Sequence, residues 1–319
     1  MISRNTAIIA AVVIGITVVS TLAGGYVLNP NWFFVASNNN NQSQIQVVAA
    51  ENFWGSLISQ LGGTHTQVLS IVSDPNADPH EYESNAANAR AIATANLVIV
   101  NGAGYDAWAL KLIAANGNQN QRVLNVADLL GKTAGGANPH FWYSPTYVNQ
   151  TLHAMYSDLV SIDTTNPAYY RQQYANLNVS LGPYNSRINK IAQNFAGTRV
   201  ASTENIFEYL AGASHLNLIS PPEFMKAVAE GIEPSPQDII TFQHQLLNGT
   251  SRGNATVLVY NAQTVTHTTQ DLKTEASQDY IPVVAMTETI QPPDVSFQEW
   301  MNAELIQLQN ALNQAAHAK

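Results

Sequence analysis

Residues 44–73 read QIQVVAAENFWGSLISQLGGTHTQVLSIVS, with a short β-branched run at each end and a helical stretch between them. The same alternation continues along the chain and is typical of α/β units with parallel strands. We expect four strands in each half, at Ile45–Ala49, Val68–Ser73, Leu97–Asn101 and Val123–Val126, then at Arg199–Ser202, Leu216–Ile219, Val257–Tyr260 and Pro282–Ala285. The sequence therefore predicts an α/β fold with two lobes, each built on a parallel sheet.

The region between the two halves, residues 145–195, carries almost no strand signal and has helical spacing in two stretches. The second stretch opens at Asn166-Pro167, where Asn is a favourable cap and Pro suits the first helical turn. Apolar residues then recur at spacings of three and four, at Tyr170, Tyr174, Leu177, Leu181, Tyr184, Ile188 and Ile191. Gly182-Pro183 interrupts this run and should kink it. We expect a long helix that joins the two lobes.

The N-terminal stretch is apolar and uncharged from Ala7 to Val27, and Arg4 precedes it. About 20 apolar residues are enough to span a membrane, and a positive charge before the span indicates that this end stays in the cytoplasm. The rest of the chain is then expected outside the cytoplasm, at the cell surface. The stretch is either an uncleaved transmembrane anchor or a signal peptide with a weak cleavage candidate at 35–37. A buried core helix is disfavoured, because the polar run 37–43 looks like a spacer.

These patterns divide the chain into four parts. They are an anchor or signal segment with its spacer (1–43), an N-terminal lobe (44–144), a helical segment with the linker helix (145–195) and a C-terminal lobe (196–319). The last lobe ends in a predicted helix over Phe297–His317, with Trp300, Leu305, Leu308 and Leu312 on one face. This apolar face should pack the helix onto the rest of the lobe.

The composition excludes several classes of function. Only 11% of the 319 residues are charged and the formal net charge is −9, so the chain has no basic surface for nucleic acid. It has no cysteine, which removes disulfides, thiolate metal sites, iron–sulfur clusters, thiol catalysis and a lipid-attachment cysteine. The sequence also contains no G-x-S-x-G, no H-E-x-x-H and no phosphate-binding glycine loop.

Four side chains of the types that divalent metals accept follow predicted strands. His80 and His140 come after the second and fourth strands, each directly after a proline that stiffens its loop. Glu204 and Glu288 come after the fifth and eighth strands. Loops beyond the carboxyl ends of parallel strands line the crevice of such lobes, so each lobe offers two ligands to one cleft. Taken singly, each histidine would be a hydrogen-bonded surface residue and each glutamate a carboxylate at a helix N-terminus.

Five stretches carry a resemblance to a known family. They are DPHEYE (78–83), ATANLVIVNG (93–102), NPHFWYSP (138–145), TENIFEYL (203–210) and PVVAMTET (282–289). With these motifs in order over Ile45–Leu312, the chain resembles the metal-binding solute-binding proteins of ABC transporters, the zinc and manganese receptors.

The resemblance implies two lobes bridged by a rigid long helix, with one divalent transition metal held in the cleft between them. Its ligands would be His80, His140, Glu204 and Glu288, the last at a position where the family often has Asp. The protein would be a monomer that captures the metal outside the cell and delivers it to a membrane permease driven by an ATPase. Metal affinity should fall as the histidines take up protons, since the reference pKa of imidazole is about 6.5.

The identity of the metal stays open between zinc and manganese. Two imidazoles with carboxylates that each bind through one oxygen make a tetrahedral zinc site. Bidentate carboxylates would raise the coordination number toward values that suit manganese. Many zinc members of the family carry a His-rich loop before the second histidine, but residues 116–137 contain no histidine.

Two other functions are alternatives. The site could be a metal-dependent hydrolase centre if one position held water and Glu81 or Glu83 acted as a base. The same fold could also serve surface adhesion. Because no substrate pocket or nucleophile motif accompanies Glu81 and Glu83, we expect a transport protein and no enzyme.

Overall fold

The computed structural model describes residues 44–74, 79, 82–247 and 254–317. Residues from Gln44 onward belong to one compact unit. The predicted anchor or signal segment lies outside the described residues. Within those ranges, no helix combines the length and the hydropathy that crossing a membrane requires.

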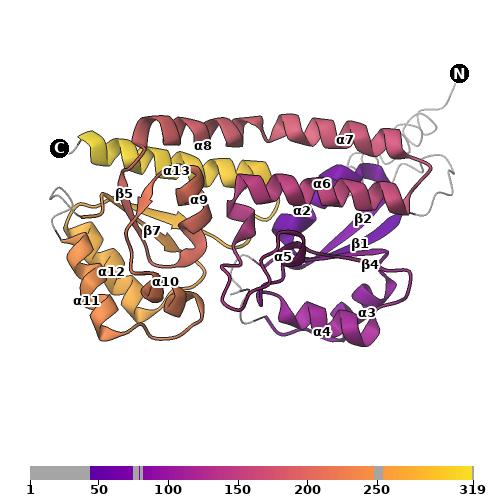
Figure 1. Cartoon of the computed structure of the whole chain (residues 1–319), viewed down its shortest axis with the longest axis horizontal. Helices are drawn as coiled ribbons and strands as arrows, with labels where there is room; N and C mark the ends of the chain where they lie inside the picture. The colour runs from indigo at the N-terminus through magenta and orange to yellow at the C-terminus, as the bar shows by residue number, and fades with distance from the viewer. Residues whose placement is uncertain (1–43, 75–78, 80–81, 248–253, 318–319) are drawn as a thin grey trace, which may run out of the picture. The chain divides into compact units, whose positions relative to one another are not determined.

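Two parallel four-stranded sheets form the frame of this unit (Figure 1). The first has the order β2-β1-β3-β4 and consists of β1 (Ile45–Glu51), β2 (Thr66–Val72), β3 (Leu97–Val100) and β4 (Arg122–Asn125). The second has the order β6-β5-β7-β8 and consists of β5 (Arg199–Ser202), β6 (Asn217–Leu218), β7 (Val257–Asn261) and β8 (Val283–Met286). All neighbouring strands run parallel, so their carboxyl ends meet at one edge of each sheet. The predicted fold class is confirmed.

All eight predicted strands are present, but only β5 has the predicted bounds, and the others differ by one or two residues at one or both ends. Two of these differences have a local cause. Val126 was expected in a strand but begins the short helix α5, because the Asn125 side chain accepts a hydrogen bond from Asp128 N and starts a turn. The strand expected over Leu216–Ile219 is shortened to two residues. This strand, β6, lies at the edge of the sheet and pairs with β5 alone, so the local sequence pattern does not define its ends well.

Helices cover both sheets and connect them. The first lobe has α2 (Asn52–Gly62), α3 (Ala86–Thr94), α4 (Ala107–Asn116) and α5 (Val126–Leu129). The connecting region has α6 (Pro145–Ile162), α7 (Pro167–Ser180) and α8 (Gly182–Phe195). The second lobe has α9 (Glu208–Ala213), α10 (Pro222–Ala229), α11 (Pro236–Leu246), α12 (His267–Gln278) and α13 (Phe297–His317).

The predicted linker is a pair of helices that follow each other directly. In Figure 1, α7 and α8 run end to end, and they are separated at Leu181, where Gly182-Pro183 was expected to kink the run. Helix α7 packs against α2 of the first lobe and α8 against α13 of the second. Arg187 of α8 fixes the latter contact, donating to Asn302 Oδ1 at 2.8 Å and to Gln309 Oε1 at 2.7 Å. The linker is therefore anchored on both lobes.

The start of α7 follows the prediction only in part. Pro167 stands at the first helical position as expected, but the side chain of Asn166 does not cap the helix. It donates instead to Asp163 Oδ2 at 2.8 Å. Asp163 also accepts hydrogen bonds from the hydroxyl groups of Thr165 and Tyr170. The side-chain amide of Asn166 therefore binds the turn before α7 and does not cap the helix.

Candidate metal centre

His140 is fully buried just before a 3-10 turn over Phe141–Tyr143, in the loop that leads from the first sheet to α6. Its Nδ1 lies 2.8 Å from Asn138 Oδ1. The Asn138 amide group is oriented by its own Nδ2, which donates to Asn205 O and to Glu208 Oε2. An oxygen therefore faces Nδ1, so the ring carries its hydrogen there and directs the Nε2 lone pair to the other side. This is the tautomer that a metal-binding histidine needs.

Glu204 is fully buried directly after β5. Its Oε1 lies 3.3 Å from His140 Nε2. Its Oε2 accepts a 2.7 Å hydrogen bond from Asn261 Nδ2. Two electron-pair acceptors, Nε2 and Oε1, thus face each other, and a cation between them would stabilise this arrangement.

Glu288 is also fully buried and follows β8. Its Oε1 accepts from Asn261 Nδ2 at 2.6 Å and from Thr264 Oγ1 at 3.2 Å, and its Oε2 accepts from Tyr105 OH at 2.6 Å. Burial and the nearby Glu288 charge raise the pKa of Tyr105 well above its usual value, so the phenol keeps the proton that it donates. No helix starts at Glu288, because the chain after it stays irregular up to α13.

The donor atoms of His140, Glu204 and Glu288 all lie within 4.8 Å of one another. The strand order explains how they meet: β5 and β8 end at the same sheet edge, and the fourth-strand loop of the first sheet brings in the imidazole. His80, the remaining predicted ligand, lies outside the described residues. Three of the four predicted side chains thus converge.

The negative charges of this cluster favour a bound cation. Two carboxylates without exposure to water are costly unless they are paired or coordinate a metal. The structure places the imidazole of His140 against Glu204, with Nε2 3.3 Å from Oε1. A divalent cation would neutralise both carboxylates, and imidazole with carboxylate is a donor set that zinc and manganese accept.

A hollow of about 440 Å³ opens beside the cluster. Residues from both halves of the chain line it, including Tyr105 and Pro139 from the first and Asn205 and Thr264 from the second. Each of these four residues is a chain neighbour or a hydrogen-bond partner of a cluster residue. The cluster therefore lies next to a hollow that both lobes line.

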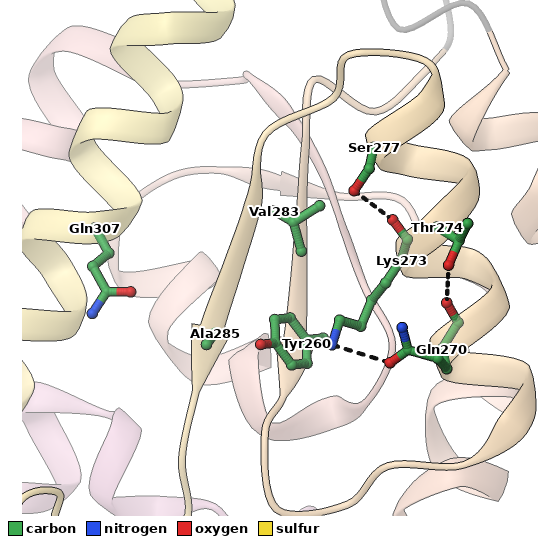
Figure 2. Close-up of a pocket in the computed structure, with 8 residues that line it drawn as sticks. All are labelled: Tyr260, Gln270, Lys273, Thr274, Ser277, Val283, Ala285 and Gln307. Atoms are coloured by element: carbon green, nitrogen blue, oxygen red, sulfur yellow. Dashed lines mark hydrogen bonds between the residues drawn. The ribbon is translucent and has the colours of Figure 1, made fainter.

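A second hollow, of about 540 Å³, has a different character (Figure 2). It lies between α12, α13 and the edge strand β8, and Lys273 is among its lining residues. The Lys273 ammonium stands 3.7 Å from the centre of the Tyr260 ring and 3.4 Å from Gln270 Oε1. No histidine or carboxylate is among its lining residues, so it offers a metal no ligand.

The bases proposed for a hydrolase are not part of the described cluster. Glu83 is exposed on the loop before α3. Glu81 lies outside the residues that the structure describes.

Sequence reasoning missed the residues that orient the cluster. Asn138, Asn261, Tyr105 and Thr264 each hold a cluster residue through a hydrogen bond. Asn261 is the last residue of β7, but its type and position alone do not distinguish it from the other asparagines of the chain.

Comparison with known protein families matches residues 47–311 to the family described as zinc-uptake complex component A, periplasmic. The chain belongs to this family. A relative, the manganese-binding lipoprotein MntA of Halalkalibacterium halodurans, is 24% identical over 130 residues. That alignment covers 40% of this chain and 42% of the length of MntA.

Solved structures share the fold of this zinc-uptake family member. The SBP FpvC from Pseudomonas aeruginosa, in complex with Mn²⁺, superimposes with a TM-score of 0.69 at 19% identity, over 85% of this chain and 99% of FpvC. A mutant of the laminin-binding adhesin Lmb from Streptococcus agalactiae also has a TM-score of 0.69, at 17% identity, over 84% of this chain and 99% of Lmb. At these identities the likeness establishes the architecture.

Proposed function

We propose that this protein is the extracytoplasmic solute-binding protein of an ABC transporter and captures a divalent transition metal, zinc or manganese. The observation that carries the proposal is the convergence of two fully buried carboxylates, Glu204 and Glu288, on His140 within 4.8 Å. Membership of the zinc-uptake family supports the same function.

The proposed ligands are His80, His140, Glu204 and Glu288. His80 comes from the sequence motif DPHEYE, and the other three come from the cluster. Two neutral imidazoles and two carboxylates balance the charge of a divalent cation. This donor set binds the ion as cargo and needs no catalytic base.

The proposed partners are a membrane permease and its cytoplasmic ATPase. The protein would act as a monomer outside the cytoplasm, attached through the N-terminal segment or released after cleavage. Because α7 and α8 pack on both lobes, the lobes should move by only a modest amount when the metal binds or leaves. Opening must break the hydrogen bond between Tyr105 and Glu288, which joins the two halves.

Metal binding by the purified full-length protein tests this function. Equilibrium dialysis against zinc or manganese, followed by elemental analysis, should find one ion per chain. His140→Ala and Glu204→Gln should each lose most of the affinity, and Asn178→Ala, on the exposed side of α7, should bind as the wild type does. Unchanged binding in both cluster variants would remove the cluster from the function. Ester hydrolysis by the metal-loaded protein would favour a hydrolase.

A further inference from the structure

Asn261 occupies the position between the two carboxylates. It is the last residue of β7, and β7 lies between β5 and β8, the strands that precede Glu204 and Glu288. Its buried side chain donates to Glu204 Oε2 at 2.7 Å and to Glu288 Oε1 at 2.6 Å. One amide group therefore holds one oxygen of each carboxylate.

The orientation of this amide is determined by the backbone. Gln263 N donates to Asn261 Oδ1 at 2.9 Å, so the oxygen of the amide is turned away from the carboxylates and the NH₂ group toward them. The two hydrogens of that group point to the two carboxylate oxygens, and Nδ2 also lies 3.1 Å from Thr264 Oγ1. Gln263 also accepts from the backbone N–H groups of Glu288 and Thr289, which fixes the loop that carries Glu288.

The hydrogen bonds define which oxygen each carboxylate presents. Glu288 Oε1 accepts from both Asn261 and Thr264, which uses its two lone-pair directions. Glu288 is thereby set to coordinate through Oε2. Glu204 Oε2 is held by Asn261, and its Oε1 is the oxygen that faces His140 Nε2.

One distance between donor atoms of the cluster fits a tetrahedral ion. Ligands at the usual zinc distances and tetrahedral angles lie about 3.3–3.5 Å apart, whereas the right angles of an octahedral site bring them to about 3 Å. The distance between His140 Nε2 and Glu204 Oε1 is 3.3 Å. The spacing thus agrees with the denticity that the hydrogen bonds impose.

We propose that Asn261, with Thr264, is a positioning residue that restricts Glu204 and Glu288 to one oxygen each and so favours zinc over manganese. The described residues then give three donor atoms to the ion, where two bidentate carboxylates would give five. A low coordination number suits zinc, and a higher one with more oxygen ligands suits manganese. This inference rests on the proposed metal-binding function and specifies its cargo.

The test is the ratio of zinc to manganese affinity, because zinc binds most nitrogen and oxygen sites more tightly than manganese whatever the geometry. In Asn261→Ala the carboxylates can rotate and bind through both oxygens. Its zinc affinity should fall about 10-fold to 100-fold, its manganese affinity should fall less, and the ratio should therefore drop. Thr264→Val removes the hydroxyl that donates to Glu288 Oε1, and it should also lower the ratio of zinc to manganese affinity. It serves as the test variant if Asn261→Ala does not fold.

Cobalt(II) gives a spectroscopic readout that a merely structural role of Asn261 would not change. The cobalt-loaded wild type should show the intense visible absorption of four-coordinate cobalt, and Asn261→Ala should show the weak absorption of higher coordination. Asn166→Ala removes another amide that donates to a carboxylate, on the linker and outside the cluster, and should change neither readout.

The outcomes separate this inference from the proposed function. A folded Asn261→Ala protein with an unchanged affinity ratio and cobalt spectrum would overturn the role of Asn261 and leave metal capture standing. Weak, high-coordination absorption in the wild type would overturn it as well. A wild-type protein that binds no zinc, manganese or cobalt would overturn the function itself.

Discussion

The phenol of Tyr105 donates a 2.6 Å hydrogen bond to Glu288 Oε2, across 183 positions of sequence. Tyr105 lies in the turn after β3 of the first sheet, and Glu288 follows β8 of the second. The turn contains Gly102, which has φ +76° and whose added Cβ would overlap Asn125 Oδ1. The turn that carries Tyr105 therefore favours glycine at position 102.

Tyr105→Phe should lower the affinity for zinc and for manganese to a similar extent, by about 10-fold. The variant keeps the ring and removes the donor at Oε2, but Asn261 and Thr264 still hold Oε1, so the number of donor atoms should not change. Competition with a chelator measures both affinities. Tyr170→Phe is the matched control, because its hydroxyl donates to Asp163 on the linker. Wild-type affinity in Tyr105→Phe would show that the bond between the lobes does not support binding.

Asn138→Ala should lower metal affinity by about 10-fold to 100-fold, because His140 loses the acceptor that fixes its tautomer and ring orientation. The same titration measures this loss, and circular dichroism checks that the protein stays folded. Asn178→Ala, on the exposed side of α7, is the control, since its amide donates only to a carbonyl of its own helix. Equal affinities in the two variants would mean that Asn138 does not orient the imidazole.

The fold was predictable from sequence because its signals are local. Alternating β-branched and helical stretches predicted parallel sheets, and Gly182-Pro183 predicted the break between α7 and α8. The boundaries at Val126 and at the edge strand β6 were not predictable. They depend on a side-chain turn and on having a single neighbouring strand.

The candidate site was predictable only as a set of ligand types. Imidazole and carboxylate groups after strands pointed to a metal, and the structure brings His140, Glu204 and Glu288 together. Asn261 could not be selected in advance, because asparagine is frequent in this chain and strand ends often carry it. Its role arises from the position of β7 between β5 and β8, which the local sequence pattern does not contain.

A pair of buried carboxyl groups, Glu51 and Asp106, should make the stability of the protein depend on pH. Burial and then the Asp106 charge raise the pKa of Glu51 well above its usual value, and burial raises the pKa of Asp106 to about 6. The folded state therefore holds protons that the unfolded chain has released, and this stabilisation is present at low pH and is lost as pH rises through the folded pKa values. For Asp106 the loss is about 3 kcal/mol, between about pH 4 and pH 6.

Glu51→Gln tests this pair. The amide can donate to Asp106 without needing a proton from solution, so the variant should melt at least about 2 °C above the wild type at pH 8 and show no advantage at pH 4. Thermal unfolding followed by circular dichroism over this range measures the difference. Glu83→Gln, on the exposed loop, should follow the wild type at both values. A Glu51→Gln curve parallel to that of the wild type would exclude proton sharing as the cause.

Glu304 holds the end of β8 that leads to Glu288. Replacing it by Ala or by Gln should separate the effect of its hydrogen bonds on stability from the effect of its charge. Its Oε1 accepts from the backbone and hydroxyl of Thr287 and from Trp300 Nε1, and its Oε2 accepts from Tyr143 OH. Glu304→Ala leaves these buried donors without their acceptor and should lower the free energy of unfolding by about 3 kcal/mol or more.

Glu304→Gln retains an acceptor and should cost much less. Burial raises the pKa of Glu304 to about 7, so the wild type should lose stability as pH rises from about 4 through 7, and the Gln variant should lose less over that interval. Urea unfolding at pH 5 and pH 8 measures both effects. Equal costs for the two substitutions would contradict a role for hydrogen bonding, because only the alanine variant removes the acceptor on which Thr287 and Trp300 depend.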